Sequence, residues 1–573
     1  MSSSDVQQIS EAPGGTDRFA GRSLYLGAST ITGPLVDSNR VHYRKVMSRG
    51  ERFKLGGIIA LNLLFGVGFV VWLLLPWHLP MPGEGISPVA LLSGYLAITM
   101  VVGVEVVRVL QTSSLWIFGT VAQDPVPMVP EPGLRVAVLT TIVPSKEPVD
   151  LVMRTLRAMK RLEHDGTLDV WILDEGDDPE VRQAAQVIGV KHFSRKGIAR
   201  WNTESGAFKA KTKAGNHNAW RDAHESDYDV VAQMDPDHVP LSDFLTRTLG
   251  YFREPDIAFV VAPQVYGNLY ENWIAHGAAS QAYVFHGIVQ RGGNGMGAPL
   301  LIGTNHLYRP TAFAQIGGYQ DSIIEDHVTA MAVYAATNPA TGHSWRGVYT
   351  PDILAIGEGP TSFTDYFNQQ KRWAYGIWDV IGNKSHRMLS HVSPAQRLSF
   401  SLLQIFYPAV AVGWLLANLA TGLYLLGAVS ANIEGVWWVA LWFASLTTSL
   451  LTFFWMRRFN LVEHERRELG LSGIGLTLTA IPIYVSAALS FLAGRPLAYA
   501  VTAKGDLTSP DRLSTFRPHL FWVAGGLILL LAGMTIGPIL VHPTVAIWAL
   551  VTIVVAAVPI AIHLAASRKK RPN

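Results

Sequence analysis

The sequence predicts an α/β domain inserted into a polytopic α-helical membrane domain. Several apolar stretches are about 20 residues long, which is the length a helix needs to cross a bilayer. Between about residues 134 and 394, short β-branched runs alternate with amphipathic helical patterns, as in a largely parallel sheet. Composition agrees, because 49% of the 573 residues are hydrophobic and only 16% are charged.

The first two apolar stretches, residues 56–77 and 88–110, predict a transmembrane hairpin. The loop between them contains no Lys or Arg. Five basic residues precede the first stretch: Arg44, Lys45, Arg49, Arg52 and Lys54. Since positive charge accumulates on the cytoplasmic side, both ends of the hairpin, and the α/β domain that follows, are expected in the cytosol.

Five more apolar segments follow the α/β domain. Four are expected to span the membrane: residues 402–426, 437–456, 521–540 and 545–566. The fifth, residues 474–492, has basic residues on both sides, so we interpret it as an interfacial or re-entrant helix, with a true span as the alternative. Six spans leave the basic C-terminal segment "RKKRPN" in the cytosol.

These segments divide the chain into six expected regions. They are a cytosolic N-terminal tail (1–54), the transmembrane hairpin (55–111), the cytosolic domain with interfacial helices (130–395), a transmembrane pair (396–457), an interfacial helix with a loop (458–517), and a last transmembrane pair with a cytosolic tail (518–573). The first 19 residues are polar and lack an apolar signal-peptide core. We therefore expect a disordered tail and no cleaved signal peptide.

Composition also excludes several classes of site. Cysteine is absent, which rules out disulfides, thiolate zinc sites, iron–sulfur clusters and a cysteine nucleophile. The net charge is only +3, from 46 Lys and Arg against 43 Asp and Glu, so no global basic field points to nucleic acid. Function must therefore be sought in local clusters.

Two carboxylates, Asp235 and Asp237, follow a short apolar strand in "QMDPDHVP". Ligands of open α/β sheets bind at the carboxyl ends of strands. Two unpaired carboxylates so close together repel and lose solvation, so a divalent cation that also binds a diphosphate is our first interpretation. A turn in which Asp237 caps a helix beginning near Leu241 explains the same residues.

Two more clusters are candidates for nucleotide binding. Asp174, in "DEGDD", ends another predicted strand and is suited to accept hydrogen bonds from a base or ribose, although acids also favour the first turn of a helix. "KAKTKAGNHNAW" places Lys209, Lys211 and Lys213 before a helix start, where N–H and ammonium groups can meet phosphate. For Lys209 and Lys211, a solvated run of charge is the preferred interpretation.

Two later motifs suggest acid–base chemistry and sugar binding. "IIEDHVTAM" places Glu325 and Asp326 between apolar residues, where desolvation and repulsion raise the pKa of at least one carboxyl and produce a general base. A structural carboxylate pair is the alternative. "FNQQKRWAYG" presents Gln369, Arg372 and Trp373, with an indole suited to stacking on a sugar. An interfacial helix with a snorkelling Arg and a belt Trp would look the same.

The order of these motifs, "DEG", "KAGNHNA", "DPDH", "ED" and "QQKRW", resembles the processive family 2 glycosyltransferases, whose best-known members are cellulose synthases. In addition, "YAVTAKG" (499–505) is similar to the gating-loop motif F-x-V-T-x-K-G of cellulose synthases, and it lies on the expected cytosolic side. The resemblance extends from the first span to the last. It implies a GT-A-like nucleotide-sugar-binding domain in a membrane domain of about six spans plus interfacial helices.

The resemblance implies roles for the donor-site residues. Asp174 would contact the uracil end of a UDP-sugar, and Lys213 would help to hold the nucleotide. Asp235 and Asp237 would bind Mg²⁺ or Mn²⁺ and the diphosphate, with His238 as a further metal ligand.

The resemblance also assigns the acceptor side. Asp326, next to Glu325, would be the general base that deprotonates the acceptor hydroxyl as it attacks the anomeric carbon in line with the leaving UDP. Gln369, Arg372 and Trp373 would shape the acceptor site at the channel entrance.

The gating-loop residues Thr502 and Lys504, with Tyr499 and Val501, would close over the donor and exclude water. Two positions depart from the family pattern: Tyr499 replaces Phe, and Ile324 replaces the usual Thr before the Glu-Asp pair. The second change is expected to alter acceptor contacts. No C-terminal β-barrel of the kind that binds cyclic-di-GMP follows the last span, so such regulation would come from another chain.

The expected activity is inverting transfer of glucose from UDP-glucose to a growing β-glucan, at the plasma membrane, with outward passage of the polymer. Accessory export proteins are expected partners. Because sugar hydroxyls would lose hydrogen bonds in lipid, a protein-lined channel is required, with aromatic residues available for stacking. The candidates are Phe406, Tyr407, Trp414, Trp437, Trp438, Trp442 and Trp455.

Three alternatives remain. Another β-linked polysaccharide, such as hyaluronan, chitin, mannan, mixed-linkage glucan or 1,3-glucan, is the nearest. Transfer of a single sugar to a lipid phosphate is disfavoured by "QQKRW", which such an enzyme does not need. A transporter or assembly scaffold with an inactive nucleotide site belongs to a different class, and the intact acidic set argues against it.

Overall fold

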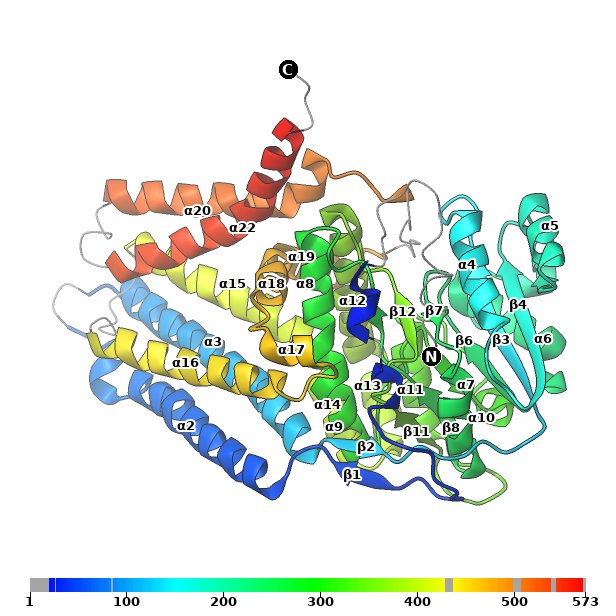
Figure 1. Ribbon diagram of the computed structural model, residues 1–573. Coiled ribbons are helices and arrows are strands. Elements are labelled where there is room, and N and C mark those ends of the chain that lie inside the picture. The colour runs from blue at the N-terminus through cyan, green and yellow to red at the C-terminus, as the bar shows by residue number, and fades with distance from the viewer. Residues whose placement is uncertain are drawn as a thin grey trace.

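The computed structural model describes residues 20–25, 27–83, 86–427, 436–497, 507–536 and 543–569. Figure 1 shows two parts: a bundle of long helices that contains early and late segments of the chain, and an α/β domain made by its middle. Shorter helices lie between them. This arrangement is the one expected for a domain inserted into a helical bundle.

Six long helices correspond to the six predicted spans, and each is long and apolar enough to cross a bilayer. They are α2 (Arg49–Leu73), α3 (Pro88–Val121), α15 (Phe406–Leu425), α16 (Val436–Arg457), α20 (Arg517–Ile536) and α22 (Pro543–Lys569). α2 begins earlier than the apolar stretch because Ser48 and Glu51 form a capping box at its start. The basic residues Arg49, Arg52 and Lys54 therefore lie in its first turns.

The fifth apolar segment forms two helices, α18 (Leu471–Thr479) and α19 (Ile481–Leu492), which meet at Ala480 before Pro482. Together they are a seventh stretch long and apolar enough to span, within the described residues. Its most apolar part is 56% buried in the protein, compared with 17% to 33% for the other six. α18 packs on α8 (Trp273–Val284), and α19 packs on α12 (Phe363–Asn383) and α15. Its interfacial position remains a prediction.

The central sheet has seven strands in the order β11-β8-β10-β6-β3-β4-β5. The strands are β3 (Leu134–Ile142), β4 (Gly166–Asp174), β5 (Lys191–Phe193), β6 (Val230–Gln233), β8 (Ile257–Val261), β10 (His306–Tyr308) and β11 (Arg346–Tyr349). All pairs are parallel except the two made by β10. After β8 the chain passes through α8. It enters β10 at the end of the sheet where β8 stops, with His306 opposite Val261, so β10 runs antiparallel to β8. A small second sheet contains β7 (Val239–Pro240), β12 (Ala355–Gly357) and β9 (Val265–Tyr266).

Helices cover both faces of the central sheet. On β3, Ala137 and Leu139 contribute to the hydrophobic cluster of one face, while Val136 and Val138 contribute to that of the other. The first cluster includes α6 (Lys213–His224), α10 (Pro310–Gln315) and α11 (Glu325–Ala335); the second includes α4 (Val149–Met159), α5 (Pro179–Val187) and α7 (Phe244–Thr248).

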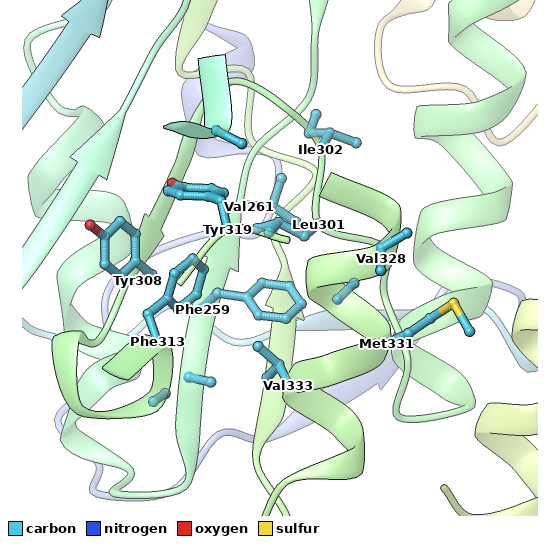
Figure 2. Packing of buried hydrophobic residues seen from close by; sticks show 14 of the residues in the cluster. Phe259, Val261, Leu301, Ile302, Tyr308, Phe313, Tyr319, Val328, Met331 and Val333 are labelled. Atoms are coloured by element: carbon cyan, nitrogen blue, oxygen red, sulfur yellow. The ribbon is translucent and has the colours of Figure 1, made fainter. Parts of the chain in front are cut away.

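The cluster on the α11 side fixes the start of that helix. Figure 2 shows Phe259, Tyr308 and Phe313 gathered beside Val328 and Met331 of α11. The rings of Tyr308 and Phe313 stack at a centroid distance of 4.0 Å. Close packing of this kind leaves little freedom to the helix. The first turn of α11, where the sequence predicts a general base, is therefore held in place by the packing of the turns that follow it.

Part of the segment expected to be an N-terminal tail is folded. From Ala20 the chain forms a short helix (η1, Ala20–Tyr25), and β1 (Tyr43–Lys45) pairs with β2 (Gln123–Pro125). The Tyr25 hydroxyl donates a hydrogen bond to the Tyr266 carbonyl at 3.2 Å. This segment thus packs on the α/β domain, whereas the expected disordered residues 1–19 lie outside the described residues.

Candidate active site

The loop after β6 carries the Asp-Pro-Asp motif and is held by three hydrogen bonds. The Asp235 N–H donates to Thr304 Oγ1 (2.9 Å), the His238 N–H donates to the Asp235 carbonyl (3.0 Å), and Thr155 Oγ1 donates to the Pro236 carbonyl (2.7 Å). The motif therefore does form a turn. α7 begins at Phe244 without a side-chain cap, so Asp237 does not cap a helix near Leu241.

The same turn brings together a set of metal-binding groups. One ligand atom each from Asp235, Asp237 and His238 lie within 4.8 Å of one another. Asp237 and His238 are fully buried, and His238 Nδ1 lies 3.4 Å from Asp237 Oδ1. Asp235 is only half-buried and faces the cavity described below. Two carboxylates with one open side fit a hard divalent cation such as Mg²⁺ or Mn²⁺.

Lys213 connects this turn to the rest of the site. It is the first residue of α6, whose N-cap Thr212 accepts a hydrogen bond from the Gly215 N–H at 3.1 Å. The Lys213 ammonium forms an ion pair with Asp235 and donates to the Gly303 carbonyl. In contrast, Lys209 pairs with Asp321, as expected for a solvated charge.

Glu325 and Asp326 begin α11 and face the same point. A Cβ atom placed on Gly303 would lie 3.4 Å from Asp326 Oδ2, 3.8 Å from Glu325 Oε1 and 3.9 Å from Lys213 Nζ. The two carboxyl groups and the Lys213–Asp235 pair therefore surround Gly303. Four separate segments of the chain, around Lys213, Asp235, Gly303 and the Glu325–Asp326 pair, therefore converge at one position.

The electrostatics of the pair favour a base that works near neutral pH. Burial, followed by the charge of Asp326, raises the pKa of Glu325 to about 7. Burial also raises the pKa of Asp326, against a hydrogen bond from the His327 N–H and the positive charges of Arg372 and Lys213. Since the two carboxyl groups repel each other, they titrate as a pair.

A single cavity of about 1210 Å³ connects these groups with the membrane helices. Lys213, Asp235, Gly303, Glu325 and Asp326 line one end of it. At the other end the lining comes from α3, α14 (Pro394–Gln404), α15, α16 and α18: Gln111, Leu115, Phe118, Leu402, Phe406, Ser449, Phe453, Ile474 and Thr477. Asp237 lies behind Asp235 and does not line the cavity.

The predicted acceptor residues lie between the two ends. Gln369, Arg372 and Trp373 share one face of α12 and all line the cavity. Gln370 also lines the cavity, is buried, and accepts a hydrogen bond from the Tyr484 hydroxyl of α19 at 2.8 Å. This bond helps to hold α12 against α19 beside the cavity.

Asp174 ends β4, as predicted, and its carboxylate is bound by its own turn. It is fully buried and accepts hydrogen bonds from the backbone N–H groups of Gly176 (2.8 Å) and Asp178 (2.6 Å), while its other contact is His192 Nε2 (3.1 Å). Asp174 does not line the cavity, whereas Glu175 does. A contact between Asp174 and a uracil base remains a prediction.

The gating-loop residues Tyr499, Val501, Thr502 and Lys504 lie outside the described residues. On the C-terminal side of that loop, Thr508 lines the cavity. Of the aromatic residues expected in a channel, Phe406 and Tyr407 line the cavity. The others do not; the indoles of Trp414 and Trp442 instead contact Trp522 and Trp548.

Several lining residues were not predicted from sequence. Glu147 follows β3, Glu358 follows β12, and Gln281 and His286 lie at the end of α8 and in the π-helical turn that extends it. Glu358 pairs with Arg154 at 3.0 Å. Glu358 could have been predicted from the sequence, because in "GEGP" an acidic residue follows a short apolar run, as Asp235 does.

Comparison with known proteins agrees with this geometry. Residues 230–456, from β6 to the end of α16, match the model of glycosyl transferase family group 2. A mannosyltransferase from Pyrobaculum calidifontis, solved in complex with GDP-Man and Mn²⁺, has 12% sequence identity and a TM-score of 0.44, and covers 70% of this chain and 99% of its own. At that score it supports no assignment of residues or substrate.

Among curated relatives, a UDP-forming cellulose synthase from Dictyostelium discoideum is 30% identical over 177 residues, which is 30% of this chain and 16% of the relative. The cellulose synthase of Xanthomonas axonopodis pv. citri is 25% identical over 294 residues, 50% of this chain and 38% of the relative. A probable glucomannan 4-beta-mannosyltransferase from Oryza sativa subsp. japonica is 25% identical over 325 residues, 53% of this chain and 59% of the relative.

The chain thus spans less than two fifths of the length of these two cellulose synthase relatives. The matched part nevertheless contains Asp235, Asp326 and the "QQKRW" helix, which line one cavity. Over this part the chain is similar to glycosyl transferase family group 2 and to cellulose synthase catalytic subunits, and its α/β domain is built into a bundle of helices long and apolar enough to cross a membrane.

Proposed function

We propose that this protein transfers glucose from UDP-glucose to the end of a growing β-glucan and passes the polymer across the plasma membrane, with its catalytic domain in the cytosol. The observation that carries the proposal is the continuous cavity. It joins Asp235 and Asp326 to a lining from membrane helices. An enzyme that released a small soluble product would have no need of that second half.

Each residue near Gly303 has a role in this reaction. Asp326 accepts the proton of the acceptor hydroxyl while that oxygen attacks the anomeric carbon. Glu325 lies beside this base, and burial together with the charge of Asp326 raises the pKa of Glu325 to about 7, so the pair titrates together. Lys213 places an ammonium group at the donor end, where negative charge develops on the leaving diphosphate.

A divalent cation, Mg²⁺ or Mn²⁺, held by Asp235 and Asp237 with His238 beside them, would supply further positive charge opposite the diphosphate. The acceptor binds against Gln369, Arg372 and Trp373, with the indole against a sugar ring. The same α12 face lines the cavity toward the membrane helices, so the product can move toward them after each transfer.

Mannan synthesis from GDP-mannose is the second candidate. The chain spans 59% of the rice glucomannan mannosyltransferase, more than of the two cellulose synthases described above. The donor-binding end is compatible with either nucleotide, because the contacts near Gly303 address the diphosphate and not the base.

Purified full-length protein in lipid nanodiscs decides between these candidates. It is incubated with radiolabelled UDP-glucose, GDP-mannose or UDP-N-acetylglucosamine, with Mg²⁺, Mn²⁺ or EDTA. We expect metal-dependent release of UDP and a labelled polymer that a β-1,4-glucanase digests. Polymer made only from GDP-mannose would establish the second candidate. Absence of turnover with any donor would indicate the transporter or scaffold alternative.

A further inference from the structure

A second, much smaller cavity lies behind the carboxyl pair. Its volume is about 10 Å³. The polar residues that line it, besides Lys213, are His217, Gln233, His306, Tyr319, Glu325 and Asp326. Lys213, Gly303 and the carboxyl pair therefore line both the large cavity and the small one.

Three of these side chains are buried and have polar atoms without hydrogen-bond partners. His217, Gln233 and His306 are each 1% exposed. Both ring nitrogens of His217, both amide atoms of Gln233 and Nδ1 of His306 have no hydrogen-bond partner among the described residues. Buried polar atoms are nearly always hydrogen-bonded, because an unsatisfied one loses its hydration without compensation. The three residues that carry these atoms line one small space.

The fold fixes these side chains where they are. His217 lies one turn after Lys213 on α6, so the two share a face. Gln233 and His306 are direct partners in the β6–β10 pairing. His306 Nε2 lies 2.8 Å from the Tyr319 hydroxyl, a side chain that belongs to the packed core in Figure 2.

The size and chemistry of the space identify its occupant. A volume of about 10 Å³ is just enough for one water molecule, which needs two to four polar partners. Burial lowers the pKa of His217 well below its usual value and that of His306 to about 3, so both rings are neutral. A neutral imidazole and an amide each offer a donor and an acceptor, which suits water better than an ion.

We propose that this space holds one ordered water molecule that bridges His217, Gln233 and His306 to the Glu325–Asp326 pair, and that His217 is a positioning residue for the general base. The water site itself is independent of the reaction. Its catalytic consequence rests on the proposed function, because it requires Asp326 to be the base. A water that donates to the ionised pair would hold the carboxylates toward Gly303 and stabilise their charge.

A structural test comes first. A cryo-EM map of the full-length protein, at a resolution that shows ordered waters, is expected to show one density peak within hydrogen-bond distance of His217, Gln233 and His306. A well-resolved space without a peak would overturn the proposal. This outcome is independent of any nucleotide sugar.

The His217→Phe variant gives a second test, in which the two possibilities predict opposite signs. If water bonds the ring, the variant loses those bonds, and its apparent Tm is expected to fall by about 1–3 °C. If the nitrogens have no partner, a slightly larger apolar ring removes an unsatisfied polar group, and Tm rises. Gln233→Met is the second variant for this test. His224→Phe is the matched control, since His224 lies on the same helix and outside the small cavity. Its ring packs on the indole of Trp171, with 4.6 Å between the ring centroids.

Kinetics test the positioning role. His217→Phe is expected to lower kcat about tenfold, with the KM for the donor unchanged, and to move the acid limb of the pH–rate profile to higher pH. The charged groups near the pair are Lys213 and Asp235 at the donor end and Arg372 on α12. His217→Gln keeps a hydrogen-bond donor and an acceptor, so it is expected to retain the wild-type kcat and the wild-type acid limb. An unchanged kcat and acid limb in His217→Phe would exclude the positioning role.

Discussion

The two ends of the large cavity are built in different ways. At the strand-end side, ion pairs and hydrogen bonds hold polar groups in place, as the contacts of Lys213 with Asp235 and with the Gly303 carbonyl illustrate. At the membrane side, the lining is mostly aliphatic and aromatic, with Phe406 and Phe453 beside isolated polar groups such as Ser449.

This difference teaches what each end requires. A reacting bond needs groups held to within a fraction of an ångström, and charge buried without such support would be costly. A polymer that moves past a surface needs contacts that tolerate displacement, and flat rings provide them. Substitutions at the first end should therefore change the rate of transfer, and substitutions at the second should change the length of the product.

The largest effect is expected for Asp326→Asn. Loss of the base should reduce the rate of UDP release by about 10²–10⁴-fold with little change in stability. Asp229→Asn is the matched control. Asp229 lies just before β6, at the other end of the strand from Asp235, and forms a half-exposed ion pair with Arg135. Initial rates with UDP-glucose measure both. A fully active Asp326→Asn protein would place the base elsewhere.

Lys213→Met should have the next largest effect. It removes the ammonium that joins Asp235 to Gly303, so the donor end loses positive charge and Asp235 loses its partner. We expect the KM for the donor to rise and kcat to fall, together by about 10–100-fold. Lys209→Met, whose partner Asp321 lies away from the cavity, is the control. Equal effects of the two variants would contradict a specific role for Lys213.

Glu325→Gln tests the coupling within the carboxyl pair. In the wild-type protein, activity should rise as pH increases through about 7, because the coupled carboxyl pair loses its last proton there. Glu325→Gln removes the carboxyl group that titrates near 7, so the acid limb should move to lower pH, where Asp326 ionises. An unmoved limb would mean that Glu325 does not act on Asp326.

Much of the fold and part of the site follow from the sequence. The strands predicted before Asp174 and Asp235 exist as β4 and β6. Asp235 follows β6, Asp326 lies in the first turn of α11, and both line the same cavity. The position of Asp174 could not be predicted, since a strand-end carboxylate can face solvent or accept the N–H groups of its own turn. Only the backbone of Gly176 and Asp178 decides between these outcomes.

The second group of missed residues has a different cause. Gly303 has no side chain to attract notice, yet its carbonyl and the space above its Cα organise the site. Gln233 follows an apolar run and His217 stands between two asparagines, and sequence alone does not distinguish a satisfied core polar group from one that lines a cavity. Such roles depend on how separate elements pack, here α6 against β6 and β10.

The smallest effect, and the one that separates the two ends most clearly, is expected for Phe406→Ala. The side chain lines the membrane end of the cavity, far along the chain from the carboxylates. Initial UDP release should change by less than about twofold, because no reacting group is disturbed, while size-exclusion chromatography should show shorter polymers. Phe443→Ala on α16, whose ring is 55% exposed and outside the cavity, is the control. If both variants make full-length polymer, the aromatic lining does not guide the product, and the membrane end would owe its shape to packing alone.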